Sequence, residues 1–113
     1  MGNEMTQLFG YYFKVEVFMR AELVYDKNLI QEWINKGILL SEQNNQMEYL
    51  IKFYNLRGSF FSWFDDYVSA IETYKLAVQL CDQHGFLEIR GKLIANIVII
   101  FNKARKIYYP DRR

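Results

Sequence analysis

Apolar residues recur along most of the chain at intervals of three and four, the spacing of one face of an α-helix. The pattern is clearest over 28–42, where they form a single stripe: Leu29, Ile30, Trp33, Ile34, Ile38 and Leu40. We predict four more helices, at about 4–25, 46–64, 66–83 and 86–109. The sequence therefore predicts an all-α protein of about five helices.

Polar residues and glycine separate these helices. The stretch 41–46, SEQNNQ, predicts a loop. Asp65 and Asp66 can cap the next helix, because a carboxylate accepts from the free N–H groups at a helix start. Gly85 can end that helix in the left-handed conformation, and Pro110 stops the last one. The β-branched run 97–100 allows a buried strand, but a single strand would have no partner, so we expect a helix there.

Two of the expected helices are apolar almost all round. The segment 4–25 carries Phe9, Tyr12, Phe13 and Phe18, and 86–109 carries Ile94 and the run Ile97 to Phe101. A helix of this kind needs cover on more than one side. We therefore expect a homo-oligomer, a dimer through the first or last helix. The alternative is that the chain is a fragment of a longer protein that covers these faces.

Composition supports the need for an interface. Of 113 residues, 51% are hydrophobic and 18% aromatic, which is more than a core of this size hides. Residues 1–89 carry seven basic and twelve acidic side chains, whereas 90–113 carry seven basic and one acidic. We interpret the basic end as a solvated helix terminus, since no aromatic-interleaved basic patch accompanies it. We expect neither nucleic acid nor a membrane as a partner.

Cysteine use and hydropathy bear on location. The single cysteine, Cys81, excludes an internal disulfide and a cysteine-rich zinc site, and it fits a reducing compartment. The richest apolar run, 93–101, has about half the length needed to span a bilayer. We find no signal peptide pattern at the start. The expected location is cytoplasmic.

Residues 54–80 resemble a tetratricopeptide repeat. The matching positions are Tyr54, Gly58, Phe61, Ala70, Tyr74 and Ala77. Small residues at 58 and 70 would let two antiparallel helices approach, while Phe61 and Tyr74 fill the space beside them. Arg57 departs from the pattern, because the family has an aliphatic residue there, and no proline closes the repeat.

A weaker echo lies forty residues earlier, where Asp26, Ile34, Gly37 and Leu40 precede Asp66, Tyr74, Ala77 and Leu80. With this longer period, residues 26–100 are most similar to the divergent repeats of bacterial peptide-sensing regulators of the Rap, PlcR and Rgg types. MalT-like transcription activators share such repeats. The resemblance implies antiparallel helix hairpins in a right-handed superhelix, with 1–113 as a single domain. The chain has no helix-turn-helix segment to match the DNA-binding part of those regulators.

In such repeats the first helix of each pair lines a concave groove. The resemblance therefore points to Lys52, Asn55, Ser59, Ser62 and Asn96 as groove residues. An asparagine amide suits an extended peptide, since it both donates to and accepts from peptide groups. The alternatives are that Asn55 lies on a solvated face and that Asn96 is a hydrogen-bonded core residue.

We find no pattern of catalytic or metal-binding residues. Ser59 and Ser62 have no candidate base, and Asp65 and Asp66 fit helix capping. His84, the single histidine, has no second ligand nearby, and there is no glycine-rich phosphate loop. Arg57 is expected to pair with Asp65 or Asp66. We expect no cofactor, no metal and no enzyme activity.

The sequence thus favours a protein- or peptide-binding module of the tetratricopeptide type. Two alternatives remain: a structural or oligomerisation domain of a larger protein, and the effector-sensing domain of a transcription regulator.

Overall fold

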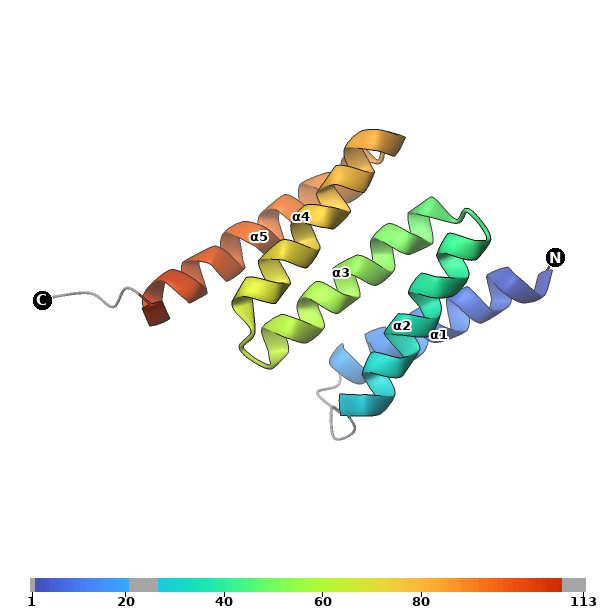
Figure 1. Ribbon diagram of the computed structural model, residues 1–113, viewed down its shortest axis with the longest axis horizontal. Helices are drawn as coiled ribbons and strands as arrows, with labels where there is room; N and C mark the ends of the chain where they lie inside the picture. The colour runs from blue at the N-terminus through green and yellow to red at the C-terminus, as the bar shows by residue number, and fades with distance from the viewer. Residues whose placement is uncertain (1, 21–26, 109–113) are drawn as a thin grey trace, which may run out of the picture. The chain divides into compact units, whose positions relative to one another are not determined.

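The protein is all-α. The computed structural model describes residues 2–20 and 27–108, and within them there are helices and tight turns but no strand. The five helices are α1 (Gly2–Arg20), α2 (Lys27–Gln43), α3 (Met47–Trp63), α4 (Tyr67–His84) and α5 (Leu87–Tyr108) (Figure 1).

The helix predictions are confirmed, with bounds shifted by one or two residues where both ends are described. The β-branched run 97–100 lies inside α5, so helix is confirmed there. The predicted continuation of the first helix from 21 to 25 lies outside the described residues.

The helices pack as two compact units, residues 1–57 and 58–113, and α3 contributes to both. We describe each unit by itself. The single domain over 1–113 and the right-handed superhelix stay predictions.

Helices and turns repeat with a period of twenty residues. From α2 to α5 the helices begin at Lys27, Met47, Tyr67 and Leu87. The turns between them each contain one residue with positive φ, and these are also twenty residues apart: Asn45 at 51°, Asp65 at 62° and Gly85 at 79°. One helix hairpin therefore takes forty residues, the period at which the sequence echoes itself.

The three turns share one hydrogen-bond pattern. The N–H one residue beyond each positive-φ residue donates to the carbonyl five residues before it, at 2.9 Å for Gln46, 2.9 Å for Asp66 and 3.1 Å for Phe86. This is the Schellman arrangement, which satisfies the carbonyls left open at a helix end. Asp66 then caps α4 by accepting from the backbone N–H of Ser69 at 3.2 Å. The caps predicted at Asp66 and Gly85 are confirmed.

In the first unit, α1 packs against α2. Leu8 and Val15 of α1, with Ile30 and Ile34 of α2, are almost fully buried. The ring of Phe53 on α3 lies on Gly37 of α2, where an added Cβ would come within 2.2 Å of the ring. The glycine therefore fixes how closely α2 and α3 approach.

In the second unit, α4 packs against α5. The buried side of α5 presents Leu93 and Ile100, and that of α4 presents small residues such as Ala70 and Ala77. The Tyr74 ring lies on Gly58, with 2.5 Å to the position of an added Cβ. The predicted close approach at Gly58 is confirmed.

Candidate partner-binding surfaces

The predicted groove residues of α3 share one side of that helix. Lys52, Asn55, Ser59 and Ser62 follow one another at intervals of three and four, and each is half-buried. Lys52 and Asn55 belong to the first unit, whereas Ser59 and Ser62 belong to the second. Asn96, half-buried on α5, is also in the second unit.

Lys52 lies between two tyrosine rings. Its Nζ is 5.8 Å from the centre of the Tyr12 ring on α1 and 5.6 Å from that of Tyr49 on α3. The two rings meet edge to face, with 6.4 Å between their centres. The nearest carboxylate is Glu48, at 3.7 Å. The attraction between a cation and an aromatic ring holds the ammonium group beside an apolar surface. An ammonium group can donate a charge-assisted hydrogen bond to a carboxylate.

Burial raises the pKa of Tyr12, and the nearby Glu16 carboxylate raises it further. The Tyr12 hydroxyl donates to Glu16, so it is already hydrogen-bonded within α1. The donor that this face offers is therefore the ammonium group of Lys52, beside the two rings.

Ser59 has a packing role. Its Oγ and the hydroxyl of Tyr74 are 2.9 Å apart, which joins α3 to α4 beside the Gly58 contact. The backbone carbonyl of Ser62 accepts from Asp65 in the turn at 3.0 Å. These contacts fix the local geometry of the helix pair. They place Ser59 in the hairpin interior as well as on the predicted face.

Two other cationic side chains contact aromatic rings in the first unit. Lys14 Nζ lies 5.4 Å from the centre of the Trp33 ring. The guanidinium of Arg57 lies 5.7 Å from the Tyr54 ring and donates to Asn35 Oδ1 at 2.6 Å. Burial lowers the pKa of Arg57. The expected pairing of Arg57 with Asp65 or Asp66 was wrong, because the side chain lies against α2.

The two carboxylates in question contact their own turn and helix. Asp65 Oδ1 accepts from the hydroxyl of Tyr67 at 3.0 Å, and Asp66 caps α4. Both therefore stabilise the junction of α3 and α4.

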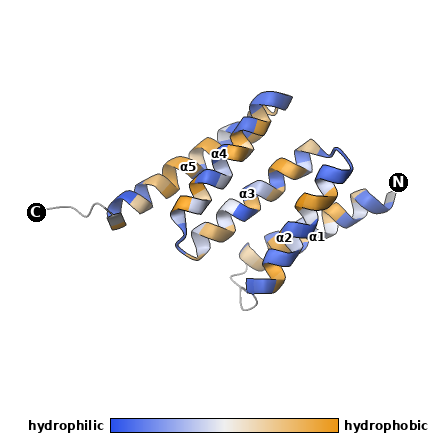
Figure 2. Ribbon diagram, in the orientation of Figure 1, coloured by the Kyte–Doolittle hydropathy of each residue, from blue (hydrophilic) through white to orange (hydrophobic). Residues whose placement is uncertain are grey.

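A row of apolar side chains on α1 is open to solvent. It consists of Met5, Phe9, Phe13 and Val17, spaced four apart, with the two phenylalanines 57% and 55% exposed. The Phe9 and Phe13 rings stack with centres 5.8 Å apart. Figure 2 shows such hydrophobic positions along both α1 and α5. Four large apolar side chains in a row mark a surface suited to a protein partner.

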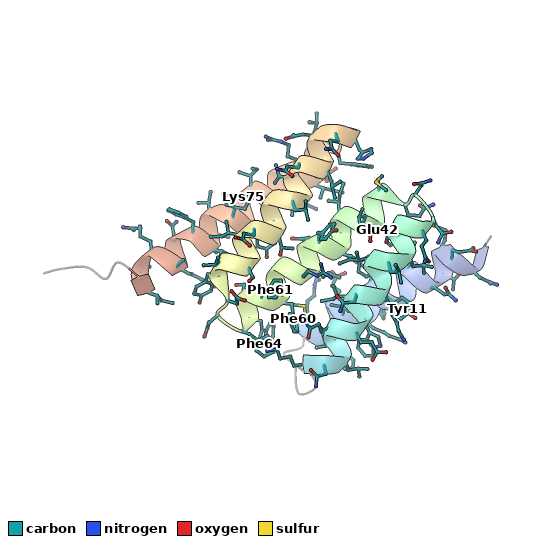
Figure 3. The ribbon with its side chains drawn as sticks, viewed as in Figure 1. Tyr11, Glu42, Phe60, Phe61, Phe64 and Lys75 are labelled. Carbon is teal, nitrogen blue, oxygen red and sulfur yellow. The ribbon has the colours of Figure 1, made fainter. Side chains whose placement is uncertain are left out.

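Aromatic rings also gather at the C-terminal end of α3. Phe60, Phe61 and Phe64 lie close together there (Figure 3). Phe60 is buried, and its ring centre lies 6.2 Å from that of Phe61 and 5.0 Å from that of Phe64. This cluster covers the turn into α4.

Within 2–20 and 27–108, no three His, Cys, Asp or Glu side chains gather as metal ligands would. The Cys81 thiol is fully buried, and its pKa is raised by burial and by the charge of Asp82. A shallow depression lies on one face of α2, and its described lining is Asn28, Gln31, Glu32, Asn35, Lys36 and Leu39.

No family model matches the chain, and neither the curated proteins nor the solved structures searched gave a match. The tetratricopeptide resemblance thus rests on the spacing of Tyr54, Gly58, Phe61, Ala70, Tyr74 and Ala77. Across the described helices, none is both long enough and apolar enough to pass through a lipid bilayer.

The sequence singled out Lys52 as a candidate but did not predict the rings around it. Tyr49 precedes Lys52 by three residues, and residues three apart on a helix are neighbours. The contact of Lys52 with Tyr49 could therefore have been predicted from the sequence. Tyr12 comes from α1, forty residues away along the chain, and only the packed unit brings it to Lys52. The spacing of four predicts that Met5, Phe9, Phe13 and Val17 share one side of α1. The sequence did not show that this side would be the one left exposed.

Proposed function

We propose that this protein is a non-catalytic interaction module that binds a peptide segment of a partner protein on the surface formed by α1 and α3. The observation that carries the proposal is the ammonium group of Lys52 over the rings of Tyr12 and Tyr49. Its i,i+4 pair with Glu48 is 3.7 Å long and solvent-exposed, so little free energy opposes its exchange for a ligand carboxylate.

Asn55 extends this surface along α3. It follows Lys52 by three residues and is half-buried. Its amide can pair with a peptide N–H and C=O, while Lys52 receives an acidic group. The expected ligand is thus a short segment with an acidic residue beside an apolar one.

The test begins with peptides selected from a random phage-displayed library on the full chain. We expect Asn55→Ala to weaken the selected peptides by about 1 kcal/mol or more, because a peptide group is left unpaired. Asn102→Ala, an exposed asparagine on α5, is the control. Unchanged affinity with a lowered melting temperature would show that Asn55 is structural and would count against the proposal.

A second candidate function is self-association as a structural domain, most simply as a homodimer. The specific observation in its favour is the set of large apolar side chains left open on α1 and α5. Those of α5 are Leu87, Ile94, Val98, Ile99, Phe101 and Ile107. Burying each contributes roughly 1.5–3 kcal/mol before the cost of association is subtracted.

A further inference from the structure

The open side of α5 carries a heptad-like seam. Its members are Leu87, Gly91, Ile94, Val98, Phe101 and Arg105, at intervals of four, three, four, three and four. All six are exposed, with Phe101 at 58%. Alternation of three and four is the spacing of a helix that packs along its length against another helix. We refer to these six residues as the α5 seam.

The equivalent face of α3, forty residues earlier in the repeat, is covered by the rest of the protein. Forty residues before the first five seam members lie Met47, Ile51, Tyr54, Gly58 and Phe61 on α3, and none of them is exposed. Within that set, Gly58 receives the ring of Tyr74 from the next helix. Its counterpart on α5 is Val98, which is 54% exposed. The α5 seam is thus the face on which a next, antiparallel helix would pack.

The structure also shows how such helix pairs fit together. In two of the three helix pairs joined by these turns, α2–α3 and α3–α4, a glycine on one helix faces an aromatic ring on the next: Gly37 with Phe53, and Gly58 with Tyr74. The α5 seam has one residue of each kind. Nothing lies within 4 Å of a Cβ built on Gly91, and Phe101 is exposed.

The seam is complementary to itself when the second helix runs antiparallel. Its spacing is the same in both directions. A two-fold axis near residue 96 therefore sets Gly91 opposite Phe101 of a second copy, and Phe101 opposite Gly91 of that copy. The same axis sets Ile94 opposite Val98. A small residue then faces a large one, and two branched side chains meet at the centre, which is the complementarity that a two-fold interface requires.

Charge selects the same direction. The first turn of α5 contains Glu88, whereas the last turn contains Arg105 and Lys106. An antiparallel pair brings Glu88 of one helix toward the basic last turn of the other, and the helix dipoles oppose favourably. Arg90 and Lys92 follow Glu88, so this contact rests on Glu88 alone. A parallel pair would set Arg105 against its own copy, which disfavours that direction.

We propose that the α5 seam binds a second copy of this chain, with the two α5 helices antiparallel about a two-fold axis near residue 96. The inference rests on the proposed self-association and adds the helix, the direction and the register. The second α5 takes the place that a following helix would occupy in the repeat.

Sedimentation equilibrium of the full chain tests the interface. We expect a dimer for the unmodified protein and at least a tenfold higher dissociation constant for Gly91→Gln. Glutamine favours the helix more than glycine does, and its side chain meets open space in the single chain. In the dimer it would occupy the space that Phe101 of the second copy needs. Gly10→Gln on α1, also in open space, is the control. Val98→Glu should dissociate the dimer into folded monomers, as circular dichroism would show.

Cross-linking tests the direction, in a Cys81→Ala background. Ala95→Cys lies beside the axis and should form a disulfide between copies. Asn102→Cys should not, because six residues of helix on each side of the axis separate the two thiols by roughly 18 Å. Cross-linking at both positions would indicate a parallel pair and overturn the proposal.

Two other outcomes are decisive. A monomer at high concentration would refute self-association itself. A dimer that tolerates Gly91→Gln but dissociates on Phe13→Glu would place the interface on α1, so self-association would stand while the α5 seam would not.

Discussion

At the scale of single residues, two glycines decide how closely neighbouring helices approach. Gly37 and Gly58 each have an aromatic ring where a Cβ would be, at 2.2 Å and 2.5 Å. Contacts this short leave no room for a methyl group unless the helix or the ring moves. Glycine normally weakens a helix interior, so its presence here is explained by packing.

We predict that Gly58→Ala lowers the free energy of unfolding by about 1–3 kcal/mol through overpacking against Tyr74. Gly10→Ala on α1 is the matched control, since nothing lies within 4 Å of its Cβ position. There the better helix propensity of alanine should raise stability by up to about 1 kcal/mol. Urea unfolding measures both. A stabilised Gly58→Ala variant would contradict the close approach of α3 and α4.

The residue scale also shows what the sequence could predict. Gly58 and Tyr74 were identified together because the resemblance supplied their spacing, and the contact is present. The Phe53 ring on Gly37 was not anticipated, although glycine and aromatic are again sixteen residues apart. Arg57 was assigned the wrong partner because charge alone favoured Asp65 or Asp66. Its rotation on α3, which points it to Asn35, depends on the packed unit.

At the scale of the helices, the turns give the fold its regularity. Asn45, Asp65 and Gly85 occupy the same left-handed position in successive turns. Glycine adopts this conformation without a Cβ clash, whereas other residues do so at a cost. Asp65 gains compensation from the hydroxyl of Tyr67, which donates to it.

We predict that Asn45→Gly raises the free energy of unfolding by roughly 0.5 kcal/mol, because asparagine tolerates positive φ less well than glycine. Gly85→Ala at the equivalent turn should lower it by about 1 kcal/mol. Thermal melts followed by circular dichroism compare the two. If Asn45→Gly and Gly85→Ala changed the stability equally and in the same direction, the turns at 45 and 85 would not share the left-handed position.

The helix boundaries were predictable because each turn carries a local signal: the polar run at 41–46, the aspartates at 65–66 and the glycine at 85. The open faces of α1 and α5 were predictable only as an excess of apolar residues. Which side stays exposed depends on how α1 meets α2 and how α4 meets α5, and that is a tertiary property.

At the scale of the whole molecule, both units bury tyrosines. Burial raises the pKa of Tyr12 and Tyr54 in the first unit and of Tyr74 in the second, above the ordinary 10.0. A raised pKa means that the folded state keeps its proton to higher pH than the unfolded state does. The associated stability is complete below pH 10 and is lost as the pH rises through the raised values.

We therefore predict that the free energy of unfolding begins to fall above about pH 9, because the buried Cys81 thiol also has a raised pKa, and falls more steeply above pH 10 as the tyrosines ionise. Urea unfolding at a series of pH values measures the slope. Tyr74→Phe removes one ionisable group and should make the fall shallower. A stability that rises above pH 10 would contradict the burial of these hydroxyls.

The most direct test of the proposed function compares two lysines that differ in their surroundings. Lys52 lies over the rings of Tyr12 and Tyr49, whereas Lys36 pairs with Glu32 on the exposed side of α2, at 2.9 Å. Fluorescence polarisation with the selected acidic peptides would be measured on the full chain and on each alanine variant. We predict that Lys52→Ala weakens binding about tenfold, near 1.4 kcal/mol, and that Lys36→Ala changes it little. Equal affinities for the two variants would contradict the account.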